Sequence, residues 1–128
     1  MLAPTLCGTT VLRRDIHADR IARRAVQGVL RDAPIEPVRD ALLLTSELVS
    51  NAIRHTPGDC CVAAHYWPHE RRLRVDVSDE SSHLPTLPKR PSAEALSGRG
   101  MRLLDDIASA WGCTPTPSGK IVWFELQW

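Results

Sequence analysis

The sequence predicts an α+β domain in which a mostly antiparallel sheet carries about three helices on one face. Two stretches of the chain, residues 18–31 and 37–55, place apolar residues at helical spacing. Residues 60–67 and 72–79 have the pattern of strands, and the connection PHER between them suits a hairpin. The order strand, helix, helix, hairpin, loop, helix, hairpin is typical of a sheet covered on one side by helices.

The composition is that of an ordinary globular domain. Of 128 residues, 43% are hydrophobic and 24% are charged, and the net charge is +1. So small a charge argues against a nucleic-acid partner, because dedicated nucleic-acid binders are usually strongly basic. No apolar stretch is long enough to span a membrane, and the N-terminus lacks the pattern of a signal peptide. We therefore expect one cytoplasmic domain over residues 1–128, without nucleic-acid or membrane partners.

The N-terminal part of the chain predicts a strand and two helices. After about eight flexible residues, residues 9–15 favour a short edge strand. The helix over residues 18–31 has arginines on one side and apolar residues on the other. Its predicted inner residues are Ala18, Ile21, Ala22, Ala25, Val26, Val29 and Leu30. The second helix should begin near Pro37, since proline is tolerated in a first turn, and end near His55 before TPGD.

The strand over residues 72–79 alternates apolar and polar residues. Leu73, Val75 and Val77 share one face, and counting on by two places Asp79 on that same face. We therefore expect Asp79 to lie at the end of the strand on the core side.

The last third of the chain predicts a long loop, a helix and a hairpin. Residues 80–97 hold three prolines and no regular period, which indicates either a functional lid or a disordered segment. Gly98, Arg99 and Gly100 then precede a helix. Its predicted inward residues are Met101, Leu104, Ala108 and Trp111. A turn at Ser118–Gly119 leads into a closing strand, KIVWFELQW, that is apolar on both faces.

A polar line crosses the otherwise apolar second helix. Glu47, Asn51 and His55 are spaced by four residues and so share one helical face. The amide oxygen of Asn51 suits Mg²⁺ that also binds phosphates, and Glu47 can deprotonate or orient a hydroxyl group or a water. The same line also fits the solvent side of an amphipathic helix. His55 fits best as a helix-ending residue, where the helix dipole favours histidine.

The glycine turn and Asp79 add the other parts of a nucleotide site. Gly98 and Gly100 at a helix N-terminus offer unpaired N–H groups to phosphate, and Arg99 adds a charged donor. The Asp79 carboxylate can accept a hydrogen bond from the amino group of adenine, whereas the carbonyl of guanine would repel it. Together with the polar line, these residues predict an ATP–Mg²⁺ site.

Three segments carry a resemblance to a known family. ELVSNAIRH, VDVSDESSHLP and SGRGMRLL resemble, in order and approximate spacing, the N, G1 and G2 boxes of the GHKL ATP-binding fold of gyrase, histidine kinases and bacterial anti-sigma serine kinases. The length and the closing KIVWFELQW look most like the small stand-alone anti-sigma branch of actinobacteria. The resemblance covers the chain from about residue 10 and implies a two-layer α/β sandwich with a mixed, mostly antiparallel sheet.

The resemblance also implies roles for individual residues. It assigns Asn51 to Mg²⁺, Glu47 to the general-base position and Asp79 to the adenine amino group. It assigns the glycines at 98 and 100 to the phosphates and the loop over residues 80–97 to the ATP lid.

Two positions depart from the family pattern. Asp79 lacks the following glycines of the usual Asp-x-Gly-x-Gly box. The closing strand often carries a threonine beside that aspartate, and here the matching position is Ile121.

The function implied by the resemblance is that of an ATP-binding anti-sigma-type regulator with protein serine/threonine kinase activity. Its expected partners are a sigma factor and an anti-anti-sigma (STAS-type) protein, and a homodimer is common in this branch. The alternatives are a non-catalytic regulator in which ATP sets partner affinity, and an adaptor with a degenerate ATP site.

The four cysteines are expected to be free thiols, because they show no CxxC spacing. They are Cys7, Cys60, Cys61 and Cys113. A metal site made from Cys60, Cys61, His65 and His69 is disfavoured. Strand alternation sends Cys60 to one face and Cys61 and His65 to the other, so the set does not close a tetrahedron. The four tryptophans are expected to pack in the core and at sheet edges.

Overall fold

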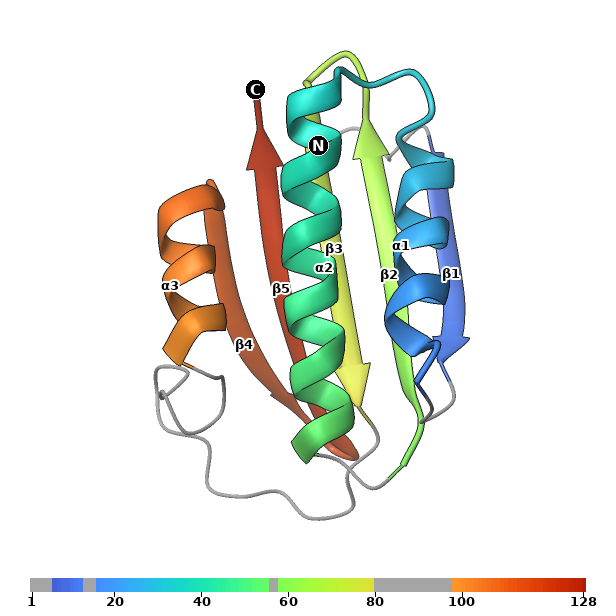
Figure 1. Cartoon of the computed structure of the whole chain (residues 1–128), viewed down its shortest axis with the longest axis vertical. Coiled ribbons are helices and arrows are strands. Elements are labelled where there is room, and N and C mark those ends of the chain that lie inside the picture. Colours follow the sequence, from blue (N-terminus) through green and yellow to red (C-terminus); the bar gives the residue numbers. More distant parts are fainter. Residues whose placement is uncertain (1–5, 13–15, 56–57, 80–97) are drawn as a thin grey trace.

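The computed structural model describes residues 6–12, 16–55, 58–79 and 98–128 of the chain. Its elements are β1 (Leu6–Leu12), α1 (Ala18–Val29), α2 (Ile35–His55), β2 (Cys60–Trp67), β3 (Arg72–Asp79), α3 (Gly98–Ile107), β4 (Ala110–Thr116) and β5 (Gly119–Gln127). Figure 1 shows the strands in one sheet and the helices together on one side of it. The predicted fold class, a two-layer α+β sandwich, is therefore confirmed. The predicted lid over residues 80–97 lies outside the described residues.

The strands follow the order β1-β2-β3-β5-β4, and every neighbouring pair is antiparallel. A mixed sheet was expected, but within the described residues the sheet is antiparallel throughout. Two hairpins, β2–β3 and β4–β5, supply four of its five strands. β1 is an edge strand, as predicted. It begins at Leu6, inside the stretch expected to be flexible, and residues 13–15 of the predicted strand lie outside the described residues.

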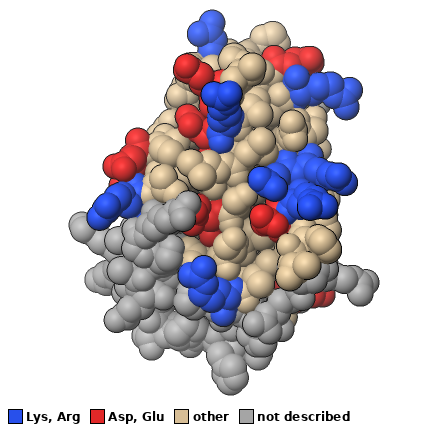
Figure 2. All heavy atoms as spheres, in the orientation of Figure 1, with Lys and Arg blue, Asp and Glu red and all other residues tan. Residues whose placement is uncertain are grey.

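Helices α1 and α2 confirm the two helices predicted in the first half of the chain. α1 buries a narrow stripe of small residues against β1, β2 and α2, and its arginines lie on the solvent side (Figure 2). The stripe consists of Ala18, Ala22, Val26 and Val29. Ile21 was expected on this inner face but is 39% exposed, because it lies at the margin of the stripe. None of the described helices is long and apolar enough to cross a membrane.

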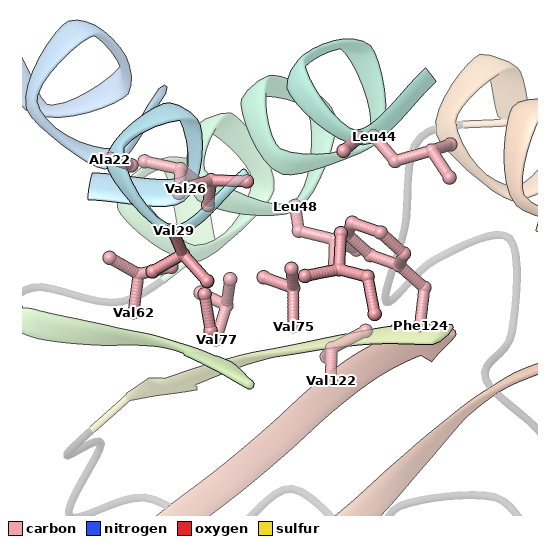
Figure 3. Packing of buried hydrophobic residues seen from close by; sticks show 14 of the residues in the cluster. Ala22, Val26, Val29, Leu44, Leu48, Val62, Val75, Val77, Val122 and Phe124 are labelled. Atoms are coloured by element: carbon pink, nitrogen blue, oxygen red, sulfur yellow. The ribbon is translucent and has the colours of Figure 1, made fainter. Parts of the chain in front are cut away.

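The core lies between the helices and the sheet, and Figure 3 shows side chains pointing into this space from both layers. Val62, Val77 and Val122 face one another across β2, β3 and β5 and form a buried row. Leu48 of α2 lies above this row, and Leu44 lies one turn earlier on the same helix (Figure 3). Burying a side chain of this size stabilises the fold by roughly 1.5–3 kcal/mol.

The C-terminal elements differ from the prediction at the end of the third helix. Leu104 is buried as predicted, but α3 ends at Ile107, so Ala108 and Trp111 are not part of it. The backbone N–H of Ser109 donates to the carbonyl of Glu125 at 2.8 Å, which starts the pairing of β4 with β5. Strand pairing therefore takes over where apolar spacing alone would continue the helix.

Candidate functional site

Four segments lie at the same end of the molecule, and three of them carry predicted site residues (Figure 1). They are the C-terminal turns of α2, the end of β3, the start of β5 and the N-terminus of α3. α2 contacts β3, β5 and α3, and Asp79 at the end of β3 pairs with Lys120 at the start of β5. The fold thus gathers at one place residues that are far apart in the sequence.

A small hollow lies between α2 and the adjoining ends of β3 and β5. Its walls are Leu48, Asn51, Ala52, Val77, Asp79, Lys120 and Val122, and its cavity volume is about 10 Å³, which is room for about one water molecule. Its polar members are Asn51, Asp79 and Lys120. A mostly apolar pocket with a few polar groups is the usual composition of a small-molecule site.

Asn51 and Asp79 meet at this hollow and are both almost fully buried. Asn51 is 5% exposed and Asp79 is 4% exposed. The alternative in which the polar line of α2 faces solvent is therefore wrong for Asn51. Glu47 lies one turn earlier on α2, is half-buried, and does not line the hollow among the described residues.

Asp79 lies on the core side because it continues the buried alternation of β3, as predicted. Its Oδ2 atom is 3.8 Å from Nζ of Lys120, and the two side chains are 2% and 15% exposed. Charges so far from water interact more strongly than charges on a surface. Among the described residues, this lysine therefore forms an ion pair with the acid that was predicted to recognise adenine.

Gly119 lets the start of β5 approach Asp79 closely. A Cβ atom at this glycine would lie 2.2 Å from the backbone oxygen of Asp79 and 2.6 Å from its Oδ1 atom. Any larger residue would therefore displace either the strand or the carboxylate. Gly119 holds the geometry of the site although it brings no functional group to it.

Two cysteines lie close to Asp79 on the helix-covered face, and both are protonated at neutral pH. Burial, together with the charge of Asp79, its partner across β2 and β3, raises the pKa of the Cys60 thiol to about 11. Burial also raises the pKa of Cys113, with Lys120 opposing and Asp79 adding to the effect. Because the thiolate is the reactive form, these two thiols are small, neutral and unreactive groups near Asp79.

The other face of β2 holds Cys61 and His65 of the disfavoured metal site, and His69 lies in the turn after the strand. Cys60 is buried on the helix side, whereas Cys61 and His65 are half-buried on the opposite side, as strand alternation requires. All four cysteines are free thiols.

Gly98, Arg99 and Gly100 form the first turn of α3 and do not precede the helix as predicted. This first turn opens at the same end of the molecule as the hollow (Figure 1). The side chain of Arg99 lies outside the described part of the structure.

The expected position of Ile121 beside Asp79 is wrong. Ile121 pairs with Ser78, and alternation along β5 places it on the helix-free face, whereas Lys120 and Val122 line the hollow. Sequence reasoning missed Lys120 and Gly119 as site residues. The sequence signal for these two residues is the SGK turn at the start of β5. It identifies them as site residues only when β5 is known to lie beside β3.

Comparisons with known proteins agree with this geometry. Residues 13–126 match the family described as the histidine kinase-like ATPase domain. A chain in the crystal structure of the RsbU and RsbW domains of Rv1364c from Mycobacterium tuberculosis has a similar fold, with a TM-score of 0.71 and 19% sequence identity. The match covers 96% of this chain and 32% of that chain, so this chain spans about a third of its length. No curated protein matches the sequence.

Proposed function

This chain belongs to the histidine kinase-like ATPase domain family, and from that premise we propose that it is an ATP-binding anti-sigma-type regulator with protein serine/threonine kinase activity. The observation that carries the proposal is the meeting of buried Asn51 and buried Asp79 at one hollow. The RsbW domain named for the structure of similar fold supports the anti-sigma assignment.

We propose that the adenine ring lies against this hollow with its amino group toward Asp79. Leu48, Val77 and Val122 give it apolar walls that suit a flat aromatic base, and Asp79 supplies one buried acceptor. That acceptor would take a hydrogen bond from the adenine amino group, and the guanine carbonyl would repel it. ATP should therefore bind in preference to GTP.

The phosphates would lie toward the first turn of α3, where unpaired N–H groups, the helix dipole and Arg99 favour anions. The amide oxygen of Asn51 fits a Mg²⁺ ligand in type and in burial. When bound, Mg²⁺ would neutralise phosphate charge. Glu47, one turn before Asn51, would accept the proton of the attacking hydroxyl group.

The proposed substrate is a serine or threonine hydroxyl of an anti-anti-sigma protein of the STAS type. Phosphorylation would add negative charge to the surface that the partner uses to bind, and so would weaken that complex. The second proposed partner is a sigma factor, held by direct binding while the anti-anti-sigma protein is phosphorylated.

Calorimetry with ATP and GTP in the presence of Mg²⁺ tests the nucleotide site. We expect ATP to bind at least about tenfold more tightly than GTP, and Asp79→Asn and Asn51→Ala to weaken ATP binding by at least about tenfold. The matched control is Asp76→Asn, which changes the same residue type on the opposite face of β3 and should leave ATP binding unchanged. Equal affinity for ATP and GTP, or no effect at Asp79, would reject the site.

Transfer of the labelled γ-phosphoryl group to the cognate anti-anti-sigma protein tests the kinase activity. Glu47→Ala should abolish transfer but keep ATP binding, since the proposed role of Glu47 is in chemistry and not in affinity. Undiminished transfer by this variant would rule out Glu47 as the base. No transfer by the wild-type chain with any candidate partner would reject the kinase assignment.

The ion pair between Lys120 and Asp79 favours a second candidate function. A carboxylate already 3.8 Å from an ammonium group is less available to adenine, which points to a regulator that binds nucleotide weakly and transfers nothing. ATP binding without phosphoryl transfer, together with ATP-dependent capture of a sigma factor, would identify this alternative.

A further inference from the structure

Three side chains form a line across β1, β2 and β3 on the helix-free face of the sheet. Sγ of Cys7 is 3.7 Å from Nδ1 of His65. On the other side of the ring, Nε2 of His65 is 3.6 Å from Oδ2 of Asp76. A thiol, an imidazole and a carboxylate in this order form the arrangement that activates cysteine nucleophiles.

The sheet register produces this line. Cys7 pairs directly with His65, and Asp76 pairs with Ala63, which places it diagonally opposite His65 on the same face. Cys7 is exposed at the edge strand, whereas His65 and Asp76 are partly buried toward the middle of the sheet.

Two neighbours fix the orientation of the imidazole and the carboxylate. Nε of Arg74 donates to Oδ1 of Asp76 at 3.0 Å, so the other oxygen, Oδ2, is left toward His65. The ring of Trp67 lies 6.3 Å from the ring of His65, centroid to centroid. Asp76 thereby favours the tautomer with the proton on Nε2, and Nδ1 remains an acceptor facing the thiol.

We propose that Cys7 is a nucleophilic thiol, with His65 as its general base and Asp76 as a positioning residue, and that it is a site of reversible mixed-disulfide formation with small disulfides. In the step, Nδ1 of His65 takes the thiol proton and Sγ attacks one sulfur of the small disulfide. The S–S bond of the small disulfide breaks as the new S–S bond forms, and the displaced thiolate recovers the proton from the imidazolium. The small disulfide itself supplies the oxidising equivalents.

The chain contains its own reference thiols for this reaction. Cys60 and Cys113 have raised pKa values and should react slowly while the chain is folded. Cys61 is the matched control, because it lies on the same face of β2 as His65 and the structure gives it no hydrogen bond or ion pair within the described residues.

The site is separate from the hollow at Asp79. His65 and Cys60 are five positions apart on β2, roughly 17 Å along the strand, and they lie on opposite faces of the sheet. The inference therefore stands without the proposed nucleotide function, and a mixed disulfide at Cys7 should leave ATP binding unchanged.

The test is the reaction of the whole chain with oxidised glutathione, followed by peptide mapping of each cysteine over time. Cys7 should react at least about tenfold faster in the folded chain than in the urea-unfolded chain, whereas Cys61 should react more slowly when folded. Acceleration on folding cannot come from exposure, since unfolding exposes every thiol. A Cys7 that reacts no faster in the folded chain overturns the proposal.

Variants then separate the roles of the two other residues. His65→Gln should abolish the acceleration at Cys7, and an unchanged rate overturns the base assignment. Asp76→Asn should reduce the rate about threefold and Asp76→Glu should restore it, whereas a merely structural role would not be rescued by another carboxylate. Protection of Cys60 reports that each variant is folded, and the wild-type comparison decides the proposal if a variant loses that protection.

Discussion

Charged side chains are distributed differently on the two faces of the sheet. On the helix-covered face, buried apolar rows run across the strands, and within the described residues charge enters only at the last row, where Asp79 lies beside Lys120. On the helix-free face, charged side chains recur along the strands and are paired. Arg74 lies 3.0 Å from Asp76 and 3.7 Å from Glu125, and it also covers the ring of Trp123.

This difference indicates where function is to be sought on each face. A half-solvated network of paired charges is an ordinary way to cover an open sheet, and its members are individually worth little. A carboxylate in the last row of an apolar face is costly unless it is paired, and Asp79 is paired there with Lys120 beside the hollow. On the helix-free face, Cys7 differs from these paired charges, because it is the proposed nucleophile and lies next to His65 at the end of the line.

The largest expected effect contrasts two neighbouring residues of β5. Phe124 is fully buried on the helix-covered face, so Phe124→Ala should reduce the free energy of unfolding by about 3–5 kcal/mol. Trp123 is half-buried on the other face, and Trp123→Ala should reduce it by only about 1 kcal/mol. Urea unfolding measures both. Equal losses in the free energy of unfolding would mean that the helix-free face is also a packed core, covered by a layer outside the described residues.

The second prediction concerns the polar end of the covered face. Gly119→Ala would push a methyl group against Asp79 and should reduce the free energy of unfolding by about 2 kcal/mol. Gly28→Ala is the control, since nothing lies within 4 Å of the added atom, and it should stabilise α1 by about 0.5–1 kcal/mol. Urea unfolding measures both changes. If Gly119→Ala is as harmless as Gly28→Ala, the close approach of β5 to Asp79 does not exist in solution.

The third prediction follows from the raised pKa of Cys60, which is about 11 in the folded chain against 9.0 as the ordinary value. Between these values the unfolded chain loses this proton and the folded chain keeps it, so stability is full below pH 9 and falls as pH rises. The free energy of unfolding should drop by about 1 kcal/mol between pH 8 and pH 10. Urea unfolding at the two pH values measures the drop.

Two variants isolate the contribution of Cys60 to this drop. Cys60→Ala should flatten the alkaline slope, although raised pKa values at Cys113 and Tyr66 will keep part of it. Cys61→Ala, on the opposite face, should leave the slope unchanged. An unchanged slope in Cys60→Ala would contradict the burial of that thiol beside Asp79.

The sequence predicted what depends on local spacing. Alternation along β3 placed Asp79 on the core side, and helical spacing placed Asn51 one turn after Glu47. Both inferences need only a count of two or of 3.6 residues. The hairpin of β2 and β3 followed from a short polar connection between two apolar runs.

What the sequence could not predict depends on which strands are neighbours. The placement of β5 beside β3 puts Lys120 next to Asp79 and turns Ile121 away, and no local pattern contains that information. The line from Cys7 to Asp76 joins three strands and was missed for the same reason. The end of α3 was missed because pairing of β4 with β5 overrides helical spacing.

The smallest expected effect concerns the ion pairs on the helix-free face, and it measures how little they contribute to stability. Glu125→Gln removes the acidic partner of Arg72 at 3.9 Å and of Arg74 at 3.7 Å. Because these groups are partly solvated, the free energy of unfolding should fall by only about 0.5 kcal/mol, and by less at high salt. Urea unfolding at low and high salt measures this.

Glu70→Gln is the matched control, since the side chain of Glu70 is 41% exposed, and it should have no measurable effect. A loss at Glu125 above about 2 kcal/mol that persists at high salt would show strong coupling on the open face. Charges on this face would then be shielded from water as Asp79 is, which requires a covering layer. Both faces of the sheet would then be covered, and Cys7 would lie at the rim of the covering layer on the helix-free face.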